Sequence, residues 1–209
     1  EESVIDVGAN SGYYSLLAAK AVGPGGRVVA FEPDPTSVLL LEENIRLNGF
    51  QNIAVRPVAL GNKCRETELY LCEHNVGDHR LWQGDEKRDY VTVWERRLDD
   101  LFLTTKELHL IKIDVQGYEL DVLKGAERLL RSHRGGLGLA IEYWPFGIKR
   151  AGRDYREFVE LLFDLDFRIY AYVINRKTHE WSFQRMTKTI LLKSLSPDED
   201  QYYDLWCVR

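Results

Sequence analysis

Short apolar runs alternate with amphipathic segments along the first part of the chain. Residues 4–7, 27–31 and 53–58 are apolar runs of the length typical of buried strands. Residues 13–22 and about 36–48 carry apolar side chains at helical spacing, and a glycine follows each of these two segments. The alternation predicts a strand, helix, strand, helix order, which is typical of a parallel sheet.

The alternation of strand and helix signals stops in the middle of the chain. Residues 66–72 and 90–97 alternate between apolar and polar positions, and a polar loop containing glycine separates them. We therefore expect a β-ribbon inserted at about 63–98. The parallel pattern then resumes with a strand at 108–115, a helix at about 118–132 and a fifth strand at 137–142.

The C-terminal part favours antiparallel structure after one more helix, at about 155–165. Residues 168–174 and 187–193 are β-rich runs joined by the polar stretch 175–184, which predicts an antiparallel hairpin. The acidic tail 198–204, with the apolar pair that follows it, fits a short docked helix or a frayed end. The expected fold is α/β, with a doubly wound, mostly parallel sheet, an inserted β-ribbon and a C-terminal antiparallel hairpin.

Length and composition fit one domain. The 209 residues are 44% hydrophobic, which suits a single compact unit spanning 1–209. The chain starts without methionine and almost on its first strand. A doubly wound domain usually has a helix or another element that shields this end of the sheet. We therefore expect this domain to be part of a longer chain.

The charge and the cysteines exclude several classes of partner and site. A net charge of −5 and the lack of a basic run argue against a nucleic-acid substrate. The sequence has no apolar stretch of membrane-spanning length and no signal peptide, so a cytoplasmic location is the default expectation. Three cysteines without C-x-x-C spacing indicate neither a disulfide framework nor a zinc site.

A glycine loop follows the first strand and carries the clearest chemistry. Gly8 and Gly12 allow a turn that wraps closely around a ligand at the N-terminus of the next helix. Asn10 stands where a dinucleotide fingerprint would have its second glycine, and its amide suits the carboxylate or ammonium group of an amino acid. With Asp6 beside the turn, the loop favours S-adenosylmethionine over a nicotinamide dinucleotide.

The ends of the next two strands would complete this site. Glu32 lies roughly two dozen residues after Gly8, the spacing of an acid that binds a ribose. The alternative interpretation of Glu32 is an ordinary surface acid. After the third strand the chain is apolar, so backbone groups near Ala59, or the side chain of Asn62, would have to recognise an adenine base.

Three ordered motifs carry a family resemblance. Residues 6–15 read DVGANSGYYS, residues 31–35 read FEPDP, and residues 111–119 read IKIDVQGYE. Together with residues 52–62 and 141–142, they resemble the FkbM family of S-adenosylmethionine-dependent methyltransferases over about 4–142. The resemblance implies a Rossmann-like class I fold and a hydroxyl acceptor on a sugar or another polyhydroxylated metabolite. It implies a cofactor site made of Asp6, Gly8, Asn10, Gly12, Tyr13, Glu32, Pro33 and Ala59. Gln116 departs from the family, which often has an acid there.

Two carboxylates are the candidates for catalysis. Asp114 ends the fourth parallel strand and would accept the proton of the acceptor hydroxyl. Glu142 ends the neighbouring strand, and two carboxylates facing one pocket can share a proton. The alternative role of Asp114 is to bond the ammonium group of the cofactor or loop amides. Mg²⁺ held by the pair is a disfavoured alternative, since two carboxylates supply too few ligands.

The sequence leaves alternatives for the roles of several other residues and for the function. The ribbon and the aromatic run at 143–146 are candidates for substrate selection, and His74 or His79 could replace Asp114 as the base. Lys112 and Glu119 are interpreted as structural. The rival functions are a binding module without turnover and a nicotinamide-dependent oxidoreductase, the latter disfavoured by Asn10 and by the absence of a Tyr-x-x-x-Lys pair.

Overall fold

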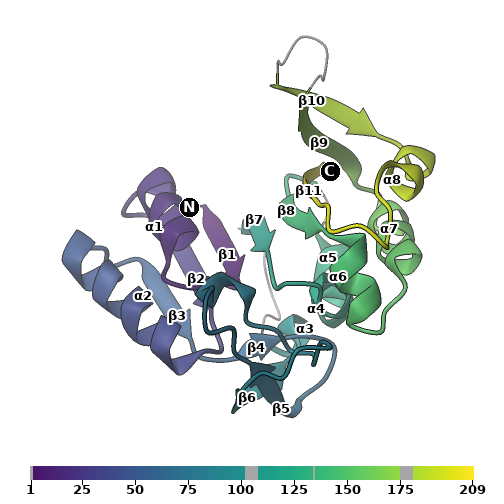
Figure 1. Ribbon diagram of the computed structural model, residues 1–209. Helices are drawn as coiled ribbons and strands as arrows, with labels where there is room; N and C mark the ends of the chain where they lie inside the picture. Colours follow the sequence, from purple (N-terminus) through teal and green to yellow (C-terminus); the bar gives the residue numbers. More distant parts are fainter. Residues whose placement is uncertain (1, 102–107, 134, 175–180) are drawn as a thin grey trace.

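The computed structural model describes residues 2–101, 108–133, 135–174 and 181–209. Within these ranges, eight strands form one sheet in the order β10-β9-β11-β8-β7-β1-β2-β3 (Figure 1). Five of these strands run parallel to one another, as the sequence predicts: β1 (Ser3–Val7), β2 (Arg27–Phe31), β3 (Ile53–Arg56), β7 (Leu108–Ile113) and β8 (Gly138–Tyr143).

Helices cover both faces of the parallel core. On one face, α1 (Tyr13–Val22) and α2 (Pro35–Asn48) pack against alternate residues of β1 and β2 such as Val4, Val28 and Ala30. The intervening residues, such as Ile5 and Ile111, point to the other face. There they join the large core with α3 (Leu98–Leu101), α4 (Glu119–Gly125), α5 (Glu127–Ser132) and α7 (Tyr155–Asp164). The sheet is therefore doubly wound, as expected.

The inserted ribbon forms a second, smaller sheet. In it β5 (Arg65–Tyr70) pairs antiparallel with β6 (Tyr90–Arg96), and β4 (Ala59–Leu60) pairs parallel with β6. This small sheet lies beside the carboxyl ends of the main strands, at the bottom of Figure 1. The predicted ribbon is thus confirmed, although the third parallel strand ends earlier than expected and Ala59 belongs to the second sheet.

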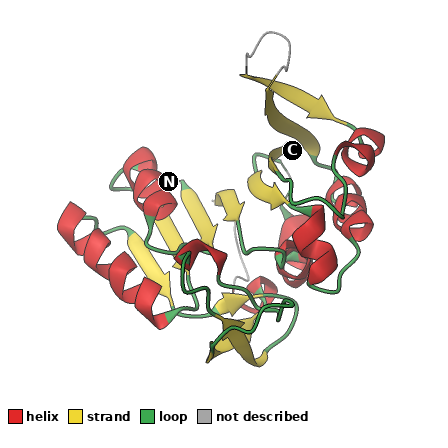
Figure 2. Ribbon diagram, in the orientation of Figure 1, coloured by secondary structure: helices red, strands yellow, loops and turns green. Residues whose placement is uncertain are grey.

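The second strand of the predicted hairpin is misplaced. The strand β9 (Arg168–Ile174) is as predicted, but its partner is β10 (Trp181–Met186), which begins inside the stretch 175–184 expected to be a loop. Residues 175–180 of that stretch lie outside the described residues. The run 187–193 forms the helix α8 (Lys188–Ser194) instead of a strand (Figure 2). Thr187 caps this helix by accepting a hydrogen bond from the Ile190 N–H at 3.2 Å.

Two further segments differ from expectation. The acidic tail leads into a strand, β11 (Tyr203–Val208), which lies antiparallel between β8 and β9. It is neither a docked helix nor a frayed end, because Leu205 and Cys207 are fully buried in the main core. The helix predicted at 118–132 is broken at Ala126 into α4 and α5. A short helix, α6 (Pro145–Arg150), follows β8.

Among the described residues, every helix is too short or too polar to cross a membrane.

Candidate functional site

The glycine loop lies where the strand order reverses, with β2 on one side of β1 and β7 on the other. Gly8 has a φ of 75°, and a Cβ there would collide with the main-chain oxygen of Asp114. The N–H groups of Gly8 and Ala9 both donate to the Phe31 carbonyl at 3.0 Å. The loop is thus wedged between the carboxyl ends of β2 and β7, where ligands of open α/β sheets bind.

Asn10 connects this loop to two other elements. Its backbone N–H donates to Glu32 Oε2 at 2.7 Å, and its side-chain Nδ2 donates to the Val76 carbonyl at 3.2 Å. Val76 begins the short 3-10 helix η1 (Val76–Asp78) of the ribbon loop. The amide expected to bond an amino acid therefore bonds the ribbon, while the backbone of Asn10 bonds the predicted ribose acid.

Glu32 is a buried carboxylate at the edge of the cleft, with 7% of its surface exposed. Its Oε1 accepts the Asp34 N–H at 2.9 Å, in addition to the bond from Asn10. Burial raises its pKa to about 7, because the loss of hydration outweighs these two backbone donors, which act in the opposite direction. A carboxyl group held by two amides has a fixed position, and each oxygen keeps a lone pair for a ligand.

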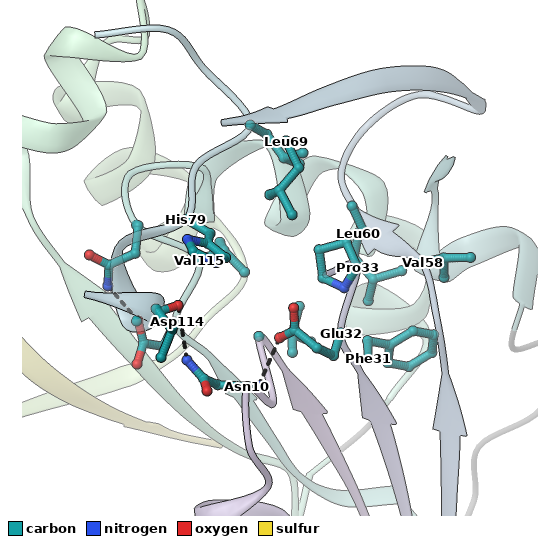
Figure 3. Close-up of a pocket in the computed structure, with 17 residues that line it drawn as sticks. Asn10, Phe31, Glu32, Pro33, Val58, Leu60, Leu69, His79, Asp114 and Val115 are labelled. Carbon is teal, nitrogen blue, oxygen red and sulfur yellow. Dashed lines mark hydrogen bonds between the residues drawn. The ribbon is translucent and has the colours of Figure 1, made fainter. Parts of the chain in front are cut away.

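Glu32 and Asp114 lie on opposite sides of a cleft at this point (Figure 3). The cleft has a volume of about 550 Å³ when the part open to solvent is included. The predicted cofactor residues Gly8, Asn10, Pro33 and Ala59 line it together with Glu32. The ribbon supplies Leu69, Val76, His79 and Leu81 as the opposite wall.

Three predicted cofactor residues do not line this cleft. Asp6 lies beneath α1, where it accepts the Ser15 hydroxyl at 2.6 Å and pairs with Lys112 Nζ at 3.2 Å. Gly12, with a φ of 94°, precedes the first turn of α1, and Tyr13 is 66% exposed. Asn62, proposed as a reader of adenine, also lies outside the cleft lining.

Lys112 is a site residue that the sequence analysis interpreted only as structural. Its Nζ donates to the Gly8 carbonyl at 2.9 Å and lies 3.8 Å from Asp114 Oδ2. It therefore ties Asp6, the glycine loop and the candidate base together. The signal was present as a polar residue inside an apolar strand, but its partners Asp6 and Gly8 lie over 100 residues away in the sequence.

Asp114 lies where two hollows of the surface meet. It lines the cleft described above and also a groove of about 1,070 Å³, including open solvent, between α1 and the strands β7, β8 and β11. Its side chain is 41% exposed. Glu142 and Asp204 line the groove as well, so the structure brings the two predicted catalytic carboxylates to one surface.

Glu142 is a carboxyl group that holds a proton near neutral pH. Its pKa is raised to about 9 by burial and, to a smaller extent, by the negative charges of Glu119, Asp114 and Asp204. Burial also raises the pKa of Glu119 to about 7. Within the described residues, one buried oxygen of each glutamate, Oε2, has no hydrogen-bond partner.

The two histidines and the aromatic run lie in different surroundings. His79 lines the cleft, its Nδ1 accepts the Cys72 N–H at 3.1 Å, and burial lowers its pKa, whereas His74 is exposed. Tyr143 and Trp144 are buried in the core. The described residues contain no group of three or more His, Cys, Asp or Glu side chains placed to hold a metal ion.

Most of the chain matches the profile of a known protein family. Residues 6–169 match the profile of the methyltransferase FkbM domain, which is more than half of the chain. The chain belongs to the FkbM methyltransferase family. Membership in this family confirms the resemblance carried by the three motifs, and it gives no support to the oxidoreductase alternative.

Individual relatives of this FkbM domain are distant. Methyltransferase 1 of Beauveria bassiana is 25% identical over 146 residues, which cover 59% of this chain and 58% of that protein. The chain thus spans little more than half of the length of this relative.

Solved structures agree on the fold. Methyltransferase FkbM from Methylobacillus flagellatus KT superposes with a TM-score of 0.57 at 21% identity, covering 99% of this chain and 43% of that one. A Streptococcus mutans protein in complex with SAH gives a TM-score of 0.56 at 10% identity, covering 100% and 88%. The α/β fold of this FkbM domain, with antiparallel strands at its C-terminal end, is therefore that of class I methyltransferases.

Proposed function

We propose that this FkbM domain transfers the methyl group of S-adenosylmethionine to a hydroxyl oxygen of a sugar or another polyhydroxylated metabolite. The observation that carries the proposal is the cleft at the reversal of strand order, with Glu32 and Asp114 on opposite sides. The family membership supports the cofactor and the reaction class. The acceptor class rests on the family resemblance, as the described residues do not identify it.

The residues of the cleft fit the cofactor. Gly8 has no room for a side chain between the loop and Asp114, so the backbone itself forms that part of the cleft wall. Glu32 would accept hydrogen bonds from the ribose hydroxyls, and the apolar wall of Pro33, Ala59 and Leu60 would contact the base. When bound, S-adenosylmethionine supplies an electrophilic methyl group on its sulfonium.

Asp114 is the proposed base. It lies in the cleft and is also reached from the groove, so an acceptor that approaches along the groove would meet the cofactor beside this carboxylate. Asp114 would orient the acceptor hydroxyl by accepting its hydrogen bond, and would take up its proton as the oxygen is methylated. Glu142, whose raised pKa keeps it neutral near pH 7, would add no negative charge beside Asp114.

Calorimetry tests the cofactor class first. The purified domain is titrated with S-adenosylhomocysteine and, separately, with NADH, each with and without Mg²⁺. We expect binding of S-adenosylhomocysteine alone, with no requirement for Mg²⁺. Binding of NADH alone would overturn the proposal.

A screen of hydroxylated acceptors with labelled S-adenosylmethionine tests turnover. Transfer to a sugar or polyol supports the hydroxyl assignment, and transfer only to amines would replace it with nitrogen methylation. Tight cofactor binding without transfer to any acceptor would favour a binding module that lacks turnover.

A further inference from the structure

A sharp turn follows Asp114 and folds the Gln116 side chain back onto the Asp114 carboxylate. Gln116 has a φ of 54°, which is unusual for a residue with a side chain, and Gly117 follows with a φ of 92°. Glu119 Oε1 holds this turn by accepting the N–H groups of Val115 at 3.0 Å and Gly117 at 3.1 Å. As a result, Gln116 Nε2 donates to Asp114 Oδ1 at 2.9 Å.

The other oxygen of Asp114 has a different environment. Oδ2 lies 3.8 Å from Lys112 Nζ, beyond hydrogen-bond distance, so it is the oxygen less engaged by the protein. The amide that donates to Oδ1 fixes the rotation of the carboxylate, and because the amide is neutral it does not offset the charge of the carboxylate. An ionised acid at position 116 would instead repel Asp114.

The backbone of Gln116 is held by the ribbon. Trp82 Nε1 donates to the Gln116 carbonyl at 2.8 Å. The indole of Trp82 is 6% exposed and packs with Tyr118 and Trp144, and the Arg80 guanidinium lies 4.7 Å from its ring centroid. This is the anchor of the ribbon loop on the loop that follows β7.

The same ribbon loop forms a wall of the cofactor cleft. Val76, His79 and Leu81 line the cleft, and Leu81 directly precedes Trp82 in the sequence. Asn10 attaches the beginning of this segment to the glycine loop through the Val76 carbonyl. The ribbon loop therefore contacts both the cofactor loop and the turn beside Asp114.

We propose that Gln116 and Trp82 are positioning residues for Asp114: the ribbon, through the Trp82 indole, holds the Gln116 turn, and the Gln116 amide orients the carboxylate. This inference rests on the proposed function, since it takes Asp114 as the base. It explains how this chain uses a glutamine where the family often has an acid. It also makes the ribbon part of the catalytic geometry in addition to a wall of the cleft.

Two variants test the contacts separately. Gln116→Ala removes the amide donor, and we expect kcat to fall about 10- to 100-fold, the loss that a misplacement of about 1 Å produces. Trp82→Phe keeps an aromatic ring but removes the N–H, and should lower kcat in the same direction by about tenfold. Trp82→Phe should leave the affinity for S-adenosylhomocysteine within about threefold, since Trp82 does not line the cleft, whereas Gln116 does line it, so kcat and not binding is the readout for Gln116→Ala.

A matched control is Trp94→Phe. Trp94 is a ribbon tryptophan on β6 that is 45% exposed and stacks with Arg96, away from the cleft lining. It should leave kcat unchanged. Thermal unfolding of all variants separates a loss of geometry from a loss of folded protein.

Gln116→Glu gives a readout that a merely structural role would not move. A second carboxylate next to Asp114 disfavours the ionised pair, so the acidic limb of the pH profile of kcat should move to higher pH by about one unit. Gln116→Asn, which keeps an amide on a shorter side chain, should leave the limb in place.

The outcomes separate this inference from the proposed function. A wild-type domain that binds cofactor but transfers no methyl group contradicts the proposed function. An active wild type with unchanged kcat and pH profile in the Gln116 variants overturns the positioning role. Crystal structures with S-adenosylhomocysteine give a test independent of the acceptor: the Asp114 carboxylate should be rotated in Gln116→Ala, and an unchanged carboxylate would also overturn the inference.

Discussion

Asp114 is the residue on which both hollows of the surface converge. Asp114→Asn keeps the shape of the side chain but removes its ability to take up a proton. We expect methyl transfer to fall by about 10²–10⁴-fold, the range for loss of a general base, with the affinity for S-adenosylhomocysteine within about tenfold. Initial rates and calorimetry on the same preparation measure the two effects.

The matched control is Asp89→Asn in the exposed part of the ribbon loop, which should leave both quantities unchanged. A large loss of cofactor affinity in Asp114→Asn would assign Asp114 to cofactor binding instead of proton transfer.

Glu142 makes the stability of the fold depend on pH. Because its pKa is raised from 4.5 to about 9, its neutral form stabilises the folded state below about pH 4.5, and this contribution is lost as the pH rises toward 9. Glu142→Gln imitates the neutral form and does not titrate. The drop in Tm between pH 5 and 8.5 should therefore shrink by at least about 2–4 °C, the effect of 1 kcal/mol in a chain of this size.

Thermal unfolding at several pH values checks this prediction. Glu32 and Glu119, whose pKa values are also raised, keep part of the pH dependence in both proteins. An identical pH dependence in wild type and Glu142→Gln would show that Glu142 is ionised in the folded state.

The individual residues differ in how far the sequence predicts them. Gly8, Glu32 and Asp114 follow short apolar runs, and such strand ends meet at one edge of a parallel sheet, so their proximity could be inferred. The roles of Lys112 and Trp82 depend on partners in other elements. Local spacing carries no information about such contacts.

At the scale of elements, burial alternates from residue to residue along β11. Leu205 is fully buried between Ile141 of β8 and Ala171 of β9, whereas its neighbour Trp206 is 41% exposed on the other face. Leu205→Ala should therefore lower the free energy of unfolding by about 2–5 kcal/mol, the cost of a core cavity. Trp206→Ala is the control, and should cost less although it removes more atoms.

Urea unfolding of both variants gives the comparison. A greater loss in Trp206→Ala than in Leu205→Ala would mean that the groove face of β11, and not its core face, is the stabilising one.

The elements that the sequence predicts correctly are those with strong local signals. Buried parallel strands read as continuous apolar runs, and the helices between them have clear end signals. The run at 187–193 has no such contrast, because a short apolar segment fits a strand or a buried helix equally well. The strand β11 was missed because its pairing with β8 and β9 is set by tertiary contacts.

At the scale of the whole molecule, one core joins distant parts of the chain. Ile5 of β1, Leu120 of α4 and Cys207 of β11 belong to the same buried cluster. We therefore propose that residues 1–209 fold as a single unit, and expect one unfolding transition that coincides by circular dichroism and fluorescence. Separate transitions would show that the ribbon or the C-terminal hairpin folds independently.

The cofactor should stabilise the whole unit. At a concentration of about 100 times its Kd, S-adenosylhomocysteine adds about 2.7 kcal/mol if it binds only the folded state. For a chain of this size the Tm should rise by roughly 5–10 °C. NADH at the same concentration serves as the control and should leave the Tm unchanged.

The position of β11 also sets an order of events during synthesis on the ribosome. The five parallel strands and the ribbon leave the exit tunnel first, followed by β9 and β10. Yet β9 pairs only with β10 and β11 among the described strands, and it reaches β8 only through β11. The hairpin therefore has no hydrogen-bonded partner in the nascent sheet until residues 203–208 emerge, so a premature stop just before them would leave the edge of β8 open.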